Sequence, residues 1–168
     1  MRRAVFLLGP DEWDEGPPAW WAPGAGQGPK RLRLDLKDAL GRIGVPCVVM
    51  DPSDQLEGEA DDAFFHRLET QHHVERYIII VPPQTKILGT VFEGGMLVRD
   101  FHYGRNPEIM CFFHETFAKT DGRGQVTFTD QGKRTRYLES LAAKAHHVGF
   151  WADPEELVPM ILRWATLP

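Results

Sequence analysis

Five short apolar runs are spaced along the chain. They cover residues 4–8, 45–50, 77–81, 109–113 and 148–151. Each run is continuously hydrophobic rather than alternating between apolar and polar positions, which is typical of strands that are covered on both faces of a parallel sheet. The pattern therefore predicts five parallel strands, and residues 125–129 are a candidate for a short additional strand.

Apolar residues recur at helical spacing between these runs. They predict helices over residues 32–43, 60–72, 91–102 and 134–146. A final helix is indicated after Asp153, because this N-cap residue is followed by Pro154 at the first helical position and then by two glutamates. Alternating strands and helices are typical of an α/β domain with right-handed crossovers, and the expected order of the five strands is 2-1-3-4-5. At 168 residues the chain fits one domain, residues 1–168.

The composition is that of an ordinary globular protein, with 42% hydrophobic and 26% charged residues. A formal net charge of -5 provides no basic surface, so nucleic acid is not an expected partner. No apolar run has the length that spans a membrane, and the run near the first residue is too short for a signal peptide, so we expect a cytoplasmic protein. Cys47 and Cys111 lie in apolar predicted strands, so we expect buried, reduced thiols.

The chain carries no motif for a redox cofactor or a metal. Neither a GxGxxG nor a GxxxxGK[ST] pattern follows the first predicted strand. Histidines occur as adjacent pairs at 72–73 and 146–147, and adjacent residues on a helix do not converge on one ion. The run KRLR at residues 30–33 is interpreted as a solvated helix start, with contact to a phosphate as the alternative. We therefore expect no cofactor and no metal.

A long loop, residues 9–30, follows the first predicted strand and holds the pair Trp20 and Trp21. Loops of this length are usually functional or disordered, and several exposed tryptophans are unfavourable. We interpret the loop as a folded flap over a pocket or against a partner. This loop and the apolar final helix are candidates for a homodimer interface.

The loops that follow the strands of a parallel sheet meet at its carboxyl edge, and a ligand crevice opens there where the strand order reverses. These loops bring together a set of candidate site residues: Gly9, Pro10, Asp11, Glu12 and Trp13 after the first strand, Asp51 after the second, Pro83, Gly89, Thr90, Phe92 and Glu93 after the third, and His114 after the fourth. Glu93 lies in the opening turn of a predicted helix. A carboxylate in that place is either a charge that suits the helix dipole or a nucleophile.

Three segments of the sequence resemble the nucleoside 2-deoxyribosyltransferase family and its N-glycosidase relatives. They are FLLGP at residues 6–10, GTVFEGG at residues 89–95 and NPEI at residues 106–109. The resemblance implies a flavodoxin-like, Rossmann-like three-layer sandwich and cleavage of the bond between the base and the sugar of a nucleoside or nucleotide. It also implies that Glu93 corresponds to the catalytic nucleophile.

These residue types suit that reaction. Breaking a bond between an anomeric carbon and a base nitrogen passes through an oxocarbenium-like state, which a carboxylate near that carbon stabilises or attacks. A nearby helix N-terminus would keep Glu93 ionised. The leaving base also needs a proton, for which Asp11, Glu12, Asp51 and His114 are the candidate donors.

Two departures from the family pattern keep other activities open. The third predicted strand, RYIIIV, lacks the aspartate that the family commonly carries there, and the following PPQTKIL segment lacks acidic residues. Hydrolysis, or a different nucleotide, is therefore favoured over transfer between the usual substrates. The alternatives are an NAD glycohydrolase similar to TIR domains, which resembles this design in fold and glutamate, and a non-catalytic module for nucleotide sensing or protein interaction.

Overall fold

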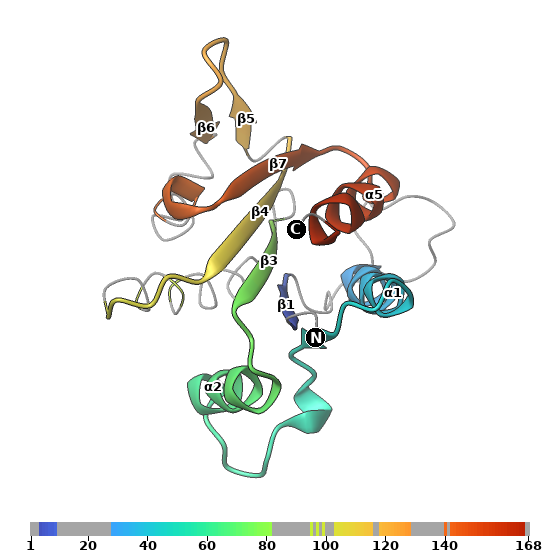
Figure 1. Cartoon of the computed structure of the whole chain (residues 1–168), viewed down its shortest axis with the longest axis vertical. Coiled ribbons are helices and arrows are strands. Elements are labelled where there is room, and N and C mark those ends of the chain that lie inside the picture. The colour runs from blue at the N-terminus through green and yellow to red at the C-terminus, as the bar shows by residue number, and fades with distance from the viewer. Residues whose placement is uncertain are drawn as a thin grey trace.

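The computed structural model describes residues 4–9, 28–81, 103–115, 118–128 and 142–166, together with residues 95, 97, 99 and 140. Its main sheet has five parallel strands in the order β2-β1-β3-β4-β7 (Figure 1). The strands are β1 (Val5–Leu8), β2 (Cys47–Val49), β3 (Arg76–Val81), β4 (Glu108–His114) and β7 (His147–Trp151). Renumbered within this sheet, the order is 2-1-3-4-5, so the predicted α/β flavodoxin-like fold is confirmed.

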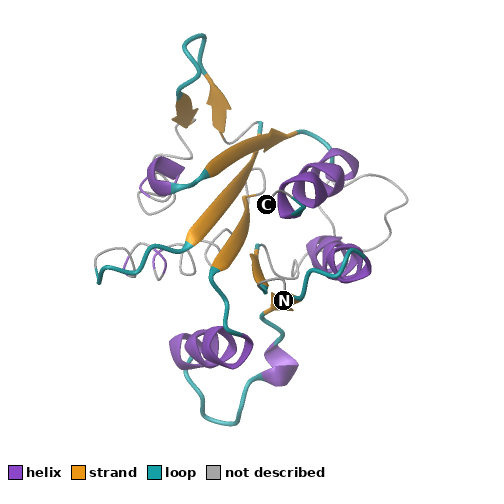
Figure 2. Ribbon diagram, in the orientation of Figure 1, coloured by secondary structure: helices purple, strands orange, loops and turns teal. Residues whose placement is uncertain are grey.

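Helices cover both faces of the sheet, as the continuous apolar strands require. On one face lie α1 (Gly28–Arg42) and α5 (Pro154–Ala165), and on the other lies α2 (Asp61–His72) (Figure 2). Leu36 of α1 and Ile161 of α5 belong to one apolar cluster with Leu7 and Ile80 of the sheet. Phe65 of α2 belongs to a second apolar cluster, which contains the strand side chains that point to the opposite face of the sheet. The layers are therefore helix, sheet, helix.

The five strands and α2 begin and end within two residues of the sequence prediction, but α1 begins at Gly28 rather than at residue 32. The bounds of the helices predicted over residues 91–102 and 134–146 lie largely outside the described residues. Its first turn carries no apolar side chain, so hydrophobic periodicity gives no sign of it. The final helix begins as predicted. The Asp153 side chain accepts a hydrogen bond of 2.8 Å from the Glu155 amide, and Pro154 occupies the first helical position.

A two-stranded antiparallel sheet follows β4. It consists of β5 (Ala118–Thr120) and β6 (Val126–Phe128), and it projects from the main sheet in Figure 1. The prediction of a short strand over residues 125–129 is confirmed by β6, whereas β5 was not predicted because its residues are not an apolar run. Asp121 closes the turn, since its Oδ1 accepts from the amides of Arg123 and Gln125, each at 2.8 Å.

Both cysteines are free, and Cys111 is buried as predicted, whereas Cys47 is only partly buried because it begins the edge strand β2. Burial raises the pKa of Cys47 to about 12 and also raises the pKa of Cys111, so both thiols are protonated near neutral pH. Within the described parts of the chain, no helix is long and apolar enough to cross a membrane.

Among the described glycines, Gly149 of β7 leaves the least room for an added side chain. A Cβ at Gly149 would lie 2.8 Å from Phe112 Cδ1 and 3.1 Å from Met160 Cε, and the Phe112 ring is fully buried. We expect Gly149→Ala to lower the free energy of unfolding by about 1–3 kcal/mol, because a closely packed core must shift to accept the methyl group. Urea denaturation measures this change.

Gly41→Ala is the matched control. Gly41 lies in α1, where an added Cβ meets nothing within 4 Å, so alanine should raise the free energy of unfolding by up to about 1 kcal/mol through its helix propensity. Equal effects of the two substitutions would contradict the tight packing at β7.

Candidate functional site

The carboxyl edge of the sheet is where the strand order reverses. The chain passes from β1 through α1 to β2 on one side, and β3 pairs with the other side of β1. In open α/β sheets, ligands bind in the crevice at such a point, outside the carboxyl ends of the strands. Gly9 directly follows β1, Asp51 follows β2, and His114 is the last residue of β4.

These three predicted site residues emerge on the same face of the sheet, the face covered by α1 and α5. A Cβ at Gly9 would lie 3.5 Å from Ile80 Cβ and 3.9 Å from Arg33 Cδ, at ordinary contact distance from β3 and α1. Asp51 lines a cleft with residues of α1. The His114 ring contacts Trp151, which packs in the apolar cluster beneath α5.

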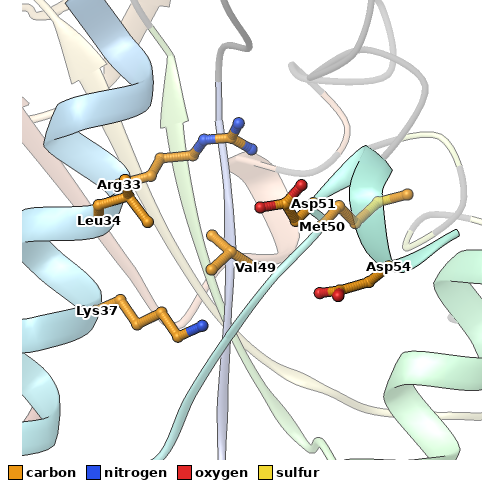
Figure 3. A pocket seen from close by; sticks show the side chains of 7 residues that line it. All are labelled: Arg33, Leu34, Lys37, Val49, Met50, Asp51 and Asp54. Atoms are coloured by element: carbon orange, nitrogen blue, oxygen red, sulfur yellow. The ribbon is translucent and has the colours of Figure 1, made fainter. Parts of the chain in front are cut away.

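The cleft lies between α1, the end of β2 and the short 3-10 helix η1 (Pro52–Asp54), and has a volume of about 60 Å³. Figure 3 shows the seven side chains that line it: Arg33, Leu34, Lys37, Val49, Met50, Asp51 and Asp54. Two cationic side chains from α1 stand on one wall, and two carboxylates stand on the other. A volume of this size holds roughly four water molecules, or one small polar group of a ligand.

Asp51 has a fixed orientation in this cleft. Its Oδ1 accepts hydrogen bonds from the Ser53 amide at 2.9 Å and from Ser53 Oγ at 2.7 Å. This local arrangement closes the turn into η1 and holds the carboxylate at the end of β2. Asp51 therefore has a structural role, and that role also presents its carboxylate to the cleft.

Arg33 was not among the predicted site residues. The interpretation of residues 30–33 as a solvated helix start is wrong for this side chain, since Arg33 is only 6% exposed. Its stem lies near Gly9, and in Figure 3 its guanidinium extends across the end of β1 toward the side of Asp51. The signal was present in the spacing, because Arg33 precedes the buried Leu36 and Leu40 by three and seven residues on one helix face.

His114 is buried at the end of β4, with 6% of its surface exposed. Its Nε2 lies 3.1 Å from the Ala152 carbonyl oxygen, and because a carbonyl can only accept, Nε2 carries the hydrogen. Its ring meets Trp151 edge-on, with a centroid distance of 4.8 Å. Burial lowers the pKa of His114, so the ring is neutral near pH 7 and Nδ1 is the nitrogen without a proton. A neutral ring in this tautomer is better suited to accept a proton than to donate one.

The other predicted site residues lie outside the described residues: Pro10, Asp11, Glu12, Trp13, Pro83, Gly89, Thr90, Phe92 and Glu93. The tryptophan pair of the long loop also lies outside them. The described chain leaves the sheet at Val81 and is helical at Gly95, Leu97 and Arg99, and Leu97 is fully buried in the cluster beneath α2. Glu93 thus precedes, in the chain, a helix that packs on the α2 face.

A larger hollow, of about 360 Å³, lies at the opposite edge of the sheet, lined by Val74, Glu75, Arg105, Asn106, Pro107 and Glu108. We assign the candidate site to the smaller cleft, because ligands of open α/β sheets bind at the carboxyl ends of the strands. Among the described residues, no three side chains of the metal-ligating types gather in one place.

Comparison of the chain with protein-family models, with curated proteins and with solved structures gives no match.

The state of His114 predicts a pH dependence of stability. The pKa of His114 in the folded protein lies below its ordinary value, so between these two pKa values the unfolded chain binds more protons than the folded one. The free energy of unfolding therefore decreases as the pH falls below the ordinary pKa of histidine. We expect urea denaturation at about pH 7.5 and about pH 5.5 to show a smaller loss of stability in His114→Gln than in the unchanged protein. An equal loss in both proteins would contradict the buried neutral ring.

Proposed function

We propose that this protein cleaves the N-glycosidic bond of a nucleoside or nucleotide, with Glu93 as the nucleophile. The observation that carries the proposal is the polar cleft at the carboxyl edge of the sheet, beside the strand-order reversal where this fold binds ligands. The sequence around Glu93, GTVFEGG, adds the chemistry through its resemblance to the deoxyribosyltransferase and N-glycosidase families.

The cleft residues support a ligand that carries both hydroxyl groups and negative charge. Asp51 offers an oriented carboxylate, which accepts hydrogen bonds from sugar hydroxyls. Arg33 and Lys37 offer positive charge on the opposite wall, which suits a phosphate. A ribose or deoxyribose phosphate presents both kinds of group.

The proposed reaction has two steps. A carboxylate oxygen of Glu93 forms a bond to the anomeric carbon while the bond from that carbon to the base nitrogen breaks, and the departing electron pair stays on the base, which takes up a proton. In the second step, water or an acceptor base attacks the anomeric carbon and releases Glu93. Asp11 and Glu12 are the proposed proton donors, and His114 is suited to accept the proton of the attacking water.

A binding module is the second candidate function. The cleft observation favours it independently of Glu93, because the cleft walls offer oriented polar contacts and Asp51 is held by Ser53 in its own turn. Such a module would bind a nucleotide and release no product.

Glu93→Gln tests the nucleophile. Each protein is incubated with nucleosides, nucleoside monophosphates and NAD, and chromatography follows the release of free base. We expect Glu93→Gln to retain the fold and to lose at least about 10³-fold in turnover, since removal of a nucleophile leaves only binding and electrostatic effects. NAD as the one substrate cleaved would support the TIR-like alternative.

Asp38→Asn is the matched control, because Asp38 lies on α1 beside Lys37 but is exposed and does not line the cleft. It should leave turnover unchanged. Ligand binding without base release from any compound, unaffected by Glu93→Gln, would replace the enzyme with the binding module.

Asp51→Asn tests the cleft. Asparagine keeps the oxygen that Ser53 contacts but removes the charge, so we expect KM to rise by roughly 10-fold with little change in kcat. Steady-state kinetics measure both constants. An unchanged KM in a folded Asp51→Asn protein would place the substrate elsewhere.

A further inference from the structure

Glu69 of α2 is a buried carboxylate that contacts several polar groups. It is 4% exposed. The Tyr77 hydroxyl of β3 donates to its Oε1, His66 Nδ1 lies 2.8 Å from its Oε2, and an Arg105 guanidinium nitrogen lies 3.6 Å from the same oxygen. A buried carboxylate is costly unless it is paired and hydrogen-bonded, so these three contacts are what allow Glu69 to remain inside the protein.

The contacts of His66 define its tautomer. Glu69 is an acceptor, so His66 Nδ1 carries the hydrogen that points to it. An Arg99 guanidinium nitrogen contacts His66 Nε2, and because a guanidinium can only donate, Nε2 is the acceptor. The chain of contacts from Glu69 through His66 to Arg99 therefore requires a neutral imidazole with its proton on Nδ1.

Arg99 and Arg105 flank the end of the helix that follows Glu93 in the chain. The Tyr103 amide donates to the Arg99 carbonyl at 3.2 Å, and Gly104, with φ of 81°, ends this turn in the left-handed region. Arg99 before the turn reaches His66, and Arg105 after it reaches Glu69. Arg105 thus contacts the Glu69 carboxylate directly, and Arg99 is linked to the same carboxylate through His66.

We infer that Glu69, acting through His66 and Arg99, is a positioning group that holds the helix following Glu93 against α2, and that proton uptake by His66 releases Arg99. A protonated imidazole has a donor at both nitrogens, so its Nε2 hydrogen would face the donors of a guanidinium of like charge. The contact with Glu69 survives protonation, whereas the contact with Arg99 does not. We call the contacts from Glu69 through His66 to Arg99 the clamp. The effect on catalysis rests on the proposed function, but the clamp itself does not.

The groups that face His66 come from each element around it. Glu69 and the edge-on ring of Phe65 come from α2, and Arg99 comes from the helix that follows Glu93. Tyr77 of β3 and Arg105 contact Glu69. Arg99 is the group among them whose contact depends on an unprotonated Nε2, so the segment that carries Arg99 is where acidification should act.

Hydrogen exchange of the peptide covering residues 95–103, corrected for the intrinsic effect of pH, tests the clamp. In the unchanged protein we expect protection to fall roughly tenfold between about pH 7.5 and about pH 5.5. Arg99→Met should show the low protection at both pH values. His66→Gln should keep high protection at both, because its uncharged amide can donate to Glu69 and accept from Arg99.

His72→Gln is the control, since His72 is an exposed histidine of the same helix and should leave the pH response unchanged. Nitrogen NMR of the imidazole adds a direct signature, with the proton of His66 on Nδ1 at high pH. A pH-independent protection in the unchanged protein, an unaltered profile in Arg99→Met, or a proton on Nε2 would each overturn the clamp.

The catalytic effect has its own readout. If base release is observed, kcat of the unchanged protein should decrease as the pH is lowered, while KM stays constant. In Arg99→Met, kcat should be low at all pH values. In His66→Gln, kcat should stay high at low pH. Base release that ignores these variants would overturn the positioning role even if the exchange results hold. Exchange results as expected without any base release would support the clamp and count against the enzymatic function.

Discussion

The burial of β1 and β3 on both faces is the constraint on which the rest of the structure depends. Side chains such as Phe6 and Leu7 of β1, or Ile79 and Ile80 of β3, alternate between the two apolar clusters and have almost no exposed surface. A strand buried in this way has no place for a charge along its length, because an unpaired charge in such a core is costly. The charged and polar side chains of the described residues are therefore concentrated at the ends of the strands and on the helices.

The two edges of the sheet use their polar groups differently. At the amino edge, Arg76 pairs with Glu108 at 3.1 Å and stacks over the Trp164 ring at 4.3 Å, so β3, β4 and α5 are joined there. At the carboxyl edge, the cleft combines cationic side chains of α1 with the carboxylates beyond β2, and His114 stands two strands away from β1. The charged groups at the amino edge contact one another, whereas those at the carboxyl edge line a cleft. On the other face of the sheet, Glu69 of α2 contacts Tyr77 of β3 and, through His66, Arg99 of the helix that follows Glu93. These contacts join the sheet, α2 and that helix.

Local patterns in the sequence were sufficient to predict the sheet. Continuous apolar runs located the five strands, and the Asp153-Pro154 pair located the start of α5, because each of these signals acts over a few residues. The burial of Arg33 and the contacts of Glu69 were not predicted, since both depend on groups brought together by the tertiary fold. In the sequence, Glu69 looks like an ordinary helix residue. Its partner Tyr77 is brought to it only by the packing of α2 against β3. Asp51 and His114 were predicted from their position after apolar strands, whereas the tautomer of His114 followed from the Ala152 carbonyl.

The central claim is that Glu93 forms a covalent bond to the sugar. A nucleoside with fluorine at the 2′ position of its sugar tests it most directly, because the electron-withdrawing fluorine destabilises the oxocarbenium-like state and slows release of the glycosyl-enzyme. After incubation and proteolysis, mass spectrometry should find the fluorosugar on the peptide that contains Glu93, and Glu93→Gln should carry none. Base release from the parent nucleoside, with the fluorosugar found on another carboxylate, would contradict the assignment of Glu93 as the nucleophile.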